Sequence, residues 1–277
     1  WRHVTIARIL CVMHPDLDQR LDASGYTSPG FPERYDKYRP RPPVALLDYL
    51  GRLIPDLKTV VDLGSGTGLS TRAWAERARQ VIGIEPNDVM RGYAEQATPH
   101  PNVRYVGRSA FDTGLSKGSA DLVTAAQSLQ WMEPEWVFPE ISRLLRPGGV
   151  FCAYQYVGLS TSVWDVGVMW QRARQRRSDL LRKYGLLESQ PRWPVSLERL
   201  NDSGVFSSAT ELAAHSIEQG NGDRLLGFAL SEGWITTLLA EGASEEEIGL
   251  DAIRQAAVAM PEPVPWWISY RVWMGVK

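Results

Sequence analysis

The chain has 277 residues, of which 44% are apolar, and its formal net charge is −2. This length and apolar content are sufficient for one large domain, or for a domain with a cap, around a buried core. The near-neutral charge provides no basic field for nucleic acid or an anionic membrane, so we expect neither as a partner and predict a small-molecule ligand.

The two cysteines indicate a reducing compartment. Cys11 and Cys152 are too few for a disulfide framework or a zinc-binding set, so we expect a cytoplasmic protein without a metal. We also expect either a monomer or a homodimer. No run approaches the roughly 20 apolar residues of a membrane-spanning helix. Residues 1–12 lack a secretory cleavage pattern, and we interpret them as an extension before a natural start at Met13.

Residues 13–43 are polar and rich in turn-forming glycine and proline, which predicts an N-terminal arm. The arm contains the segment Tyr35-Asp36-Lys37-Tyr38-Arg39-Pro40. One interpretation is an arm packed on the surface. The other is a lid, in which the Tyr35 ring covers a ligand cation and Arg39 clamps a carboxylate with two donors.

A nucleotide-binding unit is predicted next. An amphipathic helix over residues 44–53 leads to an apolar strand over residues 59–63 and the glycine loop Gly64-Ser65-Gly66-Thr67-Gly68. A helix over residues 69–78 and a strand over residues 79–84 follow, and the strand ends at Glu85. Glycines allow a ligand to approach the backbone, and a helix start offers free N–H groups to it. An acid about 20 residues after the loop can accept hydrogen bonds from both ribose hydroxyls.

The rest of the chain continues the alternation of strands and helices. After Pro86, Asn87 or Asp88 is expected to cap a helix that runs to about Gln96. We predict further strands over residues 103–106, 121–126, 150–156, 209–217 and 266–276, a helix over residues 133–145, and two or three helices over residues 223–259.

The motifs resemble those of the class I S-adenosylmethionine-dependent methyltransferases. They are Asp-Leu-Gly-Ser-Gly-Thr-Gly at residues 62–68 and Leu-Leu-Arg-Pro-Gly-Gly-Val-Phe at residues 144–151. The Tyr-x-x-Tyr-Arg-Pro segment of the arm is also similar to methyltransferases of the trans-aconitate type, which implies a carboxylated acceptor. The first resemblance implies a Rossmann-like α/β fold, with a seven-stranded, mostly parallel sheet, helices on both faces and an antiparallel last strand.

The resemblance divides the chain into four parts. Residues 1–43 are the extension and the arm or lid, and residues 44–157 are the S-adenosylmethionine-binding core. A helical cap, rich in arginine, is expected over residues 158–204. Residues 205–277 complete the core sheet and carry a further helical insert.

The resemblance also implies which residues hold the cofactor, S-adenosylmethionine. Ser109 and Ala110 stand where relatives place an acid or small polar residue against adenine, so Asp112 or the backbone is expected to replace that acid. Gln130-Trp131 stands where many relatives have His-Trp, so no catalytic base is assigned. The expected cofactor-binding residues are Asp62, Gly64, Ser65, Gly66, Glu85, Pro86, Ser109, Ala110, Gln127, Tyr35 and Arg39, and the candidate acceptor-binding residues are Trp131, Tyr154 and Trp170.

The predicted reaction is transfer of a methyl group to a small-molecule acceptor, a carboxylate or another secondary metabolite, mainly through alignment of the reactants. A carboxylate acceptor needs no general base. Two alternatives stay open: a non-catalytic protein that binds the nucleoside, and an NAD-dependent oxidoreductase. Against the oxidoreductase, Leu69 stands where the dinucleotide fingerprint has glycine or alanine.

Overall fold

The computed structural model describes residues 26, 28–161, 164–187 and 193–277, so the predicted extension at residues 1–12 and the start at Met13 lie outside the described residues. One sheet organises the fold, and its strand order is β3-β2-β1-β4-β5-β7-β6. β7 pairs antiparallel with both neighbours, while the other pairs are parallel. The expected sheet with an antiparallel last strand is thus confirmed. The strands are β1 (Thr59–Leu63), β2 (Gln80–Ile84), β3 (Val103–Val106), β4 (Ala120–Ala126), β5 (Leu145–Thr161), β6 (Ser208–Gly220) and β7 (Val264–Val276).

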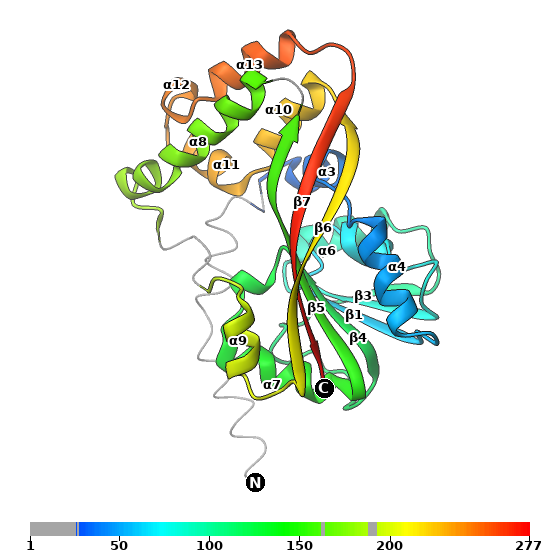
Figure 1. Cartoon of the computed structure of the whole chain (residues 1–277). Helices are drawn as coiled ribbons and strands as arrows, with labels where there is room; N and C mark the ends of the chain where they lie inside the picture. The colour runs from blue at the N-terminus through cyan, green and yellow to red at the C-terminus, as the bar shows by residue number, and fades with distance from the viewer. Residues whose placement is uncertain (1–25, 27, 162–163, 188–192) are drawn as a thin grey trace.

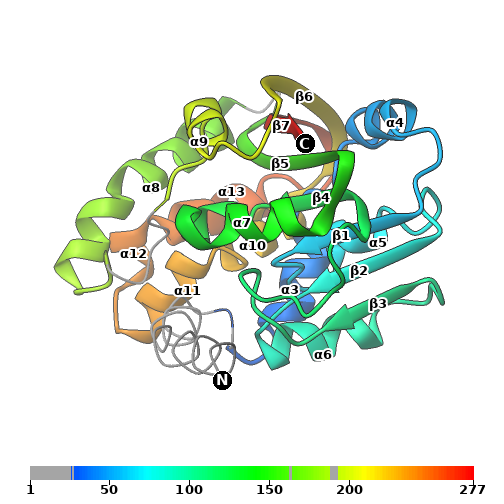
Figure 2. The ribbon, with the colours of Figure 1, turned by 90° about the horizontal axis from the view of Figure 1, so that it is seen from below.

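Helices cover both faces of the sheet because successive strand residues point to opposite sides. Val60 packs in a core with α4 (Val44–Leu53), whereas its neighbour Val61 packs in a second core with α7 (Pro134–Leu144). Figure 2 shows the strands in sequence from β3 at one end to β7 and β6 at the other, with α6 (Asp88–Gln96) beside β3. The side chain of Asn87 caps α6, as predicted, by accepting from the Met90 N–H at 3.0 Å.

The helix after the glycine loop is shorter than predicted. α5 spans Leu69–Arg72, and the chain then continues in turns, so the prediction of a helix to residue 78 was wrong. Backbone N–H groups in this stretch bond three residues back, as in Ala75 to Arg72 at 3.1 Å. The amide of Asn102 donates to the carbonyls of Ala75 and Ala78, at 2.8 and 3.0 Å, and so bonds the last of these turns to the loop before β3.

The arm contains a helix that turn-forming residues concealed. α3 (Phe31–Tyr38) begins after Gly30, which has a φ of 72°, and Pro32 stands in its first turn, where a missing N–H costs little. Phe31 is fully buried. A short 3₁₀ helix, η1 (Leu129–Trp131), follows β4.

A second layer of helices stands on the extended ends of β5, β6 and β7 (Figure 1). The apolar core of this layer contains buried residues from each of its helices, which are named below, together with Trp266 of β7. α9 (Leu197–Asp202) instead contacts β6 and β7, and its Leu200 is buried in the same core of the sheet as residues of α7. The helices of the layer are α8 (Trp164–Lys183), α10 (Gly222–Leu230), α11 (Gly233–Ala240), α12 (Glu245–Ile248) and α13 (Leu250–Val258).

This layer, hereafter the cap, draws on two parts of the chain. α8 comes from the predicted cap at residues 158–204, and α10 to α13 come from residues 222–258, where two or three helices were predicted and four are found. Among the described residues, no helix has both the length and the apolar character needed to cross a membrane.

Candidate active site

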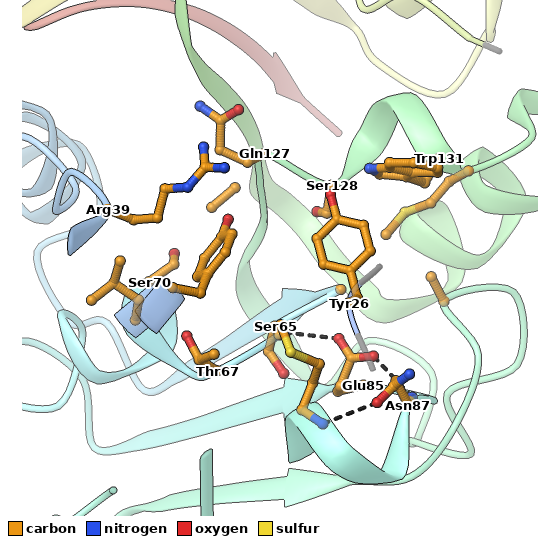
Figure 3. Close-up of a pocket in the computed structure, with 18 of the residues that line it drawn as sticks. Tyr26, Arg39, Ser65, Thr67, Ser70, Glu85, Asn87, Gln127, Ser128 and Trp131 are labelled. Atoms are coloured by element: carbon orange, nitrogen blue, oxygen red, sulfur yellow. Dashed lines mark hydrogen bonds between the residues drawn. The ribbon is translucent and has the colours of Figure 1, made fainter. Parts of the chain in front are cut away.

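A cavity opens at the carboxyl ends of β1, β2 and β4, where ligands bind in open α/β sheets. It encloses about 1160 Å³, its open mouth included. Figure 3 shows Glu85 and Asn87 at one end of this cavity and Gln127 at the other. Of the residues predicted for the site, the cavity is lined by Tyr35, Arg39, Gly64, Ser65, Gly66, Glu85, Pro86, Ser109, Ala110, Gln127, Trp131 and Tyr154.

The glycine loop forms the floor of the cavity. Gly64 and Gly66 have φ values of 65° and 55°, which glycine adopts without strain. A Cβ on Gly64 would lie 2.7 Å from the Cβ of Ser128, so the loop touches the end of β4. The Gly64 and Ser65 N–H groups donate to the carbonyl of Ile84, at 2.9 and 3.0 Å, and thereby hold the loop against the end of β2.

Glu85 is the buried acid of the cavity, with only 5% of its surface exposed. Its two oxygens accept from the N–H groups of Gly66 and Asn87, at 2.8 and 2.9 Å. Burial raises the pKa of Glu85 to about 7, although both hydrogen bonds favour the charged form. Each carboxylate oxygen has a further lone pair, so the group can still accept from a ligand's hydroxyls.

Asp62 lies behind the loop and not in the cavity lining. Its oxygens accept from the hydroxyls of Thr71 and Thr124, each at 2.7 Å, so the partners are side chains of α5 and β4. Burial raises the pKa of Asp62 to about 6. In this position Asp62 orients α5 and the loop, and its predicted contact with the cofactor stays a prediction.

Three buried polar atoms in the cavity wall have no hydrogen-bond partner among the described residues: Ser65 Oγ, Thr67 Oγ1 and Gln127 Nε2. Buried polar atoms are paired in the great majority of cases, so unpaired ones that line a cavity point to a polar ligand. Together with the Glu85 carboxylate, they offer donors and acceptors that fit an amino acid and a ribose. No group of three or more metal-ligating side chains occurs among the residues that could be searched.

Gln127 has a strained backbone at the far end of the cavity. Its φ is 55°, and it is the one residue other than glycine with a positive φ in the described part of the chain. The Gln127 N–H donates to the Tyr154 carbonyl at 3.0 Å, and the Gln127 carbonyl accepts from the Gln130 amide at 2.7 Å. The amide of Gln155 donates in turn to Gln130. Such strain persists where surrounding contacts enforce it, often at functional sites.

Residues of the arm line the cavity, and the interpretation of the arm as a lid stays a prediction. Arg39 is 7% exposed, and its guanidinium donates to Ser231 Oγ at 2.8 Å and pairs with Glu232 at 2.9 Å. The rings of Tyr35 and Phe228 each lie 4.9 Å from that guanidinium. Arg39 therefore ties the arm to the cap, and its predicted clamp on a ligand carboxylate stays a prediction.

The adenine end of the site was predicted at residues 109–112, and its contact with adenine stays a prediction. Ser109, Ala110 and Phe111 line the cavity. Asp112, expected as a substitute for the missing acid, is not in the lining; its side chain is 75% exposed and lies 4.0 Å from Arg108. The Phe111 ring and the small residues Ser109 and Ala110 therefore form this wall of the cavity.

A second chamber, of about 900 Å³, adjoins the first and reaches into the cap. Trp170, predicted to bind the acceptor, lines this chamber and packs 5.1 Å from the Phe228 ring. Both chambers share the residues Tyr26, Tyr35, Arg39, Gln127, Trp131 and Tyr156, which we call the junction.

Sequence reasoning missed several residues of the two chambers. Tyr26, Tyr156, Tyr270 and Glu232 line them, although none belongs to a motif. Tyr156 and Tyr270 occur in predicted strands, where an aromatic residue is normally interpreted as part of the hydrophobic core. Glu232 carries no local signal either, because its partner Arg39 is far away in the sequence.

Comparison with known proteins identifies the central part of the chain. Residues 61–153 match the family model of a methyltransferase domain. An uncharacterized methyltransferase of Mycobacterium tuberculosis is 33% identical over 138 residues, which cover 50% of this chain and 53% of that protein. A trans-aconitate 2-methyltransferase of Acidovorax ebreus is 34% identical over 125 residues, 44% of this chain and 46% of its own length. The chain spans about half the length of these curated relatives.

A solved structure of a proposed type II methyltransferase from Anaeromyxobacter dehalogenans has the same fold. It aligns with a TM-score of 0.65 and 26% identity, over 86% of this chain and 98% of the other. Residues 61–153 therefore form a methyltransferase domain. The resemblance to the class I enzymes is confirmed over this domain, and with it S-adenosylmethionine as the cofactor of the domain.

Proposed function

We propose that this protein transfers the methyl group of S-adenosylmethionine to a small-molecule acid. The observation that carries the proposal is the cavity at the ends of β1, β2 and β4, whose wall combines the buried Glu85 carboxylate with three unpaired polar atoms. A dinucleotide would need glycine or alanine at the position of Leu69, which is buried at the start of α5.

Each part of the cavity has a separate task in this proposal. Glu85 accepts from the ribose hydroxyls, and the wall formed by Ser109 to Phe111 borders the adenine. Ser65 Oγ and Thr67 Oγ1 bind the polar groups of the methionine portion beside the glycine loop. The methyl group then faces the junction, where Gln127 Nε2 is free to donate to the acceptor.

The chemistry follows from the bound sulfonium, which supplies an activated methyl group to an attacking acceptor oxygen. The acceptor carboxylate forms the new O–C bond while the S–C bond breaks, and the electron pair of that bond remains on sulfur. The products are a methyl ester and S-adenosylhomocysteine, and no proton is released. The chain contributes alignment and exclusion of water, which together are worth up to about 7–11 kcal/mol in favourable cases.

Two lines of support favour a carboxylic acid as the acceptor. One group of relatives has the name trans-aconitate 2-methyltransferase, and trans-aconitate is a carboxylic acid. In addition, Tyr35 of the junction is a poor general base at neutral pH, since burial raises its pKa above the usual value and keeps its hydroxyl protonated. A carboxylate is already nucleophilic and fits such surroundings.

Calorimetry with S-adenosylhomocysteine, S-adenosylmethionine and NAD tests the cofactor. We expect the two adenosyl compounds to bind, and Glu85→Ala to weaken binding by about 1–3 kcal/mol, the range for hydrogen bonds to a charged group. Binding of NAD alone would overturn the proposal. Unchanged affinity in Glu85→Ala would remove Glu85 from the site.

An activity assay separates an enzyme from a protein that only binds the nucleoside. Release of S-adenosylhomocysteine is measured with trans-aconitate, a phenol and an amine as acceptors. Turnover with the acid alone supports the proposal, and turnover with the phenol or amine alone would replace the acceptor class. The cytoplasmic location, the monomeric or dimeric state and the lack of a nucleic-acid partner remain predictions from composition.

A further inference from the structure

Three glutamines form a chain of hydrogen bonds that ends at the junction. Gln155 of β5 donates its side-chain amide to the Oε1 atom of Gln130 in η1. The Nε2 atom of Gln130 donates in turn to the backbone carbonyl of Gln127, at 2.7 Å. Both ends of the Gln130 amide are therefore used, one as an acceptor and one as a donor, and the chain ends on the backbone of Gln127.

The turn at Gln127 is fixed from several sides. The Gln127 N–H donates to the Tyr154 carbonyl at 3.0 Å, and Ser128 Oγ donates to the Leu63 carbonyl at 2.6 Å. These two contacts attach the turn to β5 and β1, while Gln130 holds the Gln127 carbonyl. Together they enforce the φ of 55° at Gln127, a left-handed conformation that a residue with a Cβ rarely adopts.

This backbone conformation determines where the Gln127 side chain points. The side chain lines both chambers, and its Nε2 atom is buried without a hydrogen-bond partner among the described residues. Figure 3 shows Gln127 at the end of the cavity opposite Glu85. A buried donor without a partner is costly, so its presence in the wall of a cavity indicates that a ligand supplies the acceptor atom.

Gln155 can act on a ligand only through the other two glutamines. Gln130 lines the second chamber, but Gln155 is absent from the described lining of both chambers. The Gln155 donor fixes the orientation of the Gln130 amide, because the reversed amide would place its oxygen against the Gln127 carbonyl. The orientation of one amide therefore decides whether the turn at Gln127 is held.

Building on the proposed methyl transfer, we propose that Gln130 and Gln155 are positioning residues for the acceptor. Their amides hold Gln127 in its left-handed conformation, and Gln127 Nε2 donates to one oxygen of the acceptor carboxylate. The other carboxylate oxygen is then directed toward the methyl group, so the two glutamines contribute to the alignment on which the reaction depends.

The first test needs no acceptor. In the full chain labelled with ¹⁵N-glutamine, the side-chain N–H signals of Gln127 and Gln130 are assigned by their loss in Gln127→Gly and Gln130→Met. Gln155→Met keeps the length of the side chain and removes its amide, so we expect it to move both signals. The matched control is Gln219→Met, at an exposed glutamine of β6, which should leave both in place. A Gln127 signal that Gln155→Met leaves unmoved would overturn this inference.

The second test measures acceptor binding to protein saturated with S-adenosylhomocysteine, whose binding is first verified by calorimetry. Trans-aconitate is the probe, and we expect it to move the Gln127 signal of the wild type. Gln130→Met and Gln155→Met should weaken its affinity about three- to tenfold, the range for one hydrogen bond, and leave the affinity for S-adenosylhomocysteine unchanged.

A double-mutant cycle separates positioning from a general structural effect. Glycine adopts a positive φ without help, so Gln155→Met should not weaken trans-aconitate binding further once Gln127→Gly is present. Additive effects of the two substitutions, or a Gln127 signal that trans-aconitate leaves unmoved, would overturn this inference. Failure of the wild type to bind S-adenosylhomocysteine would instead overturn the proposed function, and the first test would still decide whether the glutamine chain holds Gln127.

Discussion

Arg39 Nη1 lies 2.9 Å from a carboxylate oxygen of Glu232, and this ion pair joins the residue after α3 to the residue before α11. The side chains are 7% and 20% exposed, so the pair is largely removed from water. The arm and the cap, which are distant in the sequence, are thereby held together beside the junction.

Glu232→Gln should lower the free energy of unfolding by about 1–3 kcal/mol, because a buried guanidinium would lose its compensating charge. Urea unfolding measures the change. The control is Asp179→Asn, which breaks a pair with Arg182 whose side chains are 65% and 84% exposed. A loss no larger than that of the control would show that Glu232 behaves as a surface residue.

Glu85 should make stability depend on pH. Burial raises its pKa from 4.5 to about 7, so between these values the folded protein retains a proton that the unfolded chain releases. The stabilising contribution of Glu85 is therefore complete below about pH 4.5 and is lost as the pH rises through 7. Urea unfolding at several pH values should show wild-type stability falling over this window relative to the stability of Glu85→Gln. Parallel pH profiles would contradict the assignment.

The affinity for S-adenosylhomocysteine should change with pH in the opposite sense. An ionised Glu85 accepts hydrogen bonds from the ribose hydroxyls more strongly than the neutral acid does. Calorimetry between pH 6 and 8, a range around the raised pKa, should therefore show wild-type affinity increasing with pH. Glu85→Gln should show a flatter profile, and equal slopes would exclude a direct contact with the ribose.

Two glycine substitutions should have effects of opposite sign. Gly64→Ala would place a Cβ 2.7 Å from Ser128 in a backbone with φ 65°, so we expect a loss of about 1–3 kcal/mol in stability and weaker donor binding. Gly51 lies within α4 with open space around it, so Gly51→Ala should stabilise the protein by about 0.5–1 kcal/mol. Thermal and urea unfolding measure both, and a neutral Gly64→Ala would refute the tight contact between the loop and β4.

Tyr154 was expected to bind the acceptor, but its hydroxyl lies 2.5 Å from the hydroxyl of Ser70. Tyr154→Phe should therefore cost about 1 kcal/mol of stability, the usual contribution of one hydrogen bond, and leave the KM of the acceptor unchanged. Tyr49→Phe, at a ring that is 48% exposed, is the control. A higher KM with unaltered stability would return Tyr154 to the acceptor site.

Local sequence predicted the elements that depend on local patterns. The helix over residues 44–53 and the strands over residues 59–63 and 103–106 have the predicted bounds. Their apolar patterns match the faces that they bury. The Asn87 cap was also predictable, because capping depends only on whether its side chain reaches the third N–H of the helix that follows. The helix after the glycine loop ends at Arg72 and the chain continues in turns, although the residues up to Ala78 are good helix formers.

The part of the site formed by the glycine loop and Glu85 could also be predicted from the sequence. The glycines and Glu85 form one strand-loop-strand unit whose geometry is set by neighbouring strands. The second chamber could not be predicted as a whole, because it is assembled from the arm, α8, α11 and other distant segments, and no short pattern connects them. Arg174 and Arg177 belong to a positive run of the predicted cap, and the sequence does not distinguish them from the other arginines of that run.

The sequence by itself therefore determined the strands around the glycine loop, the loop and the place of the acid, because these follow from residue periodicity and short spacings, while the antiparallel last strand of the sheet was implied by the family resemblance. Only the tertiary structure decided that Arg39 meets Glu232, that Asp62 stays behind the loop and that one face of α8 turns two arginines into a cavity. The physical reason is that these contacts join residues far apart in the chain, and burial of apolar surface on several elements together decides which side chains meet.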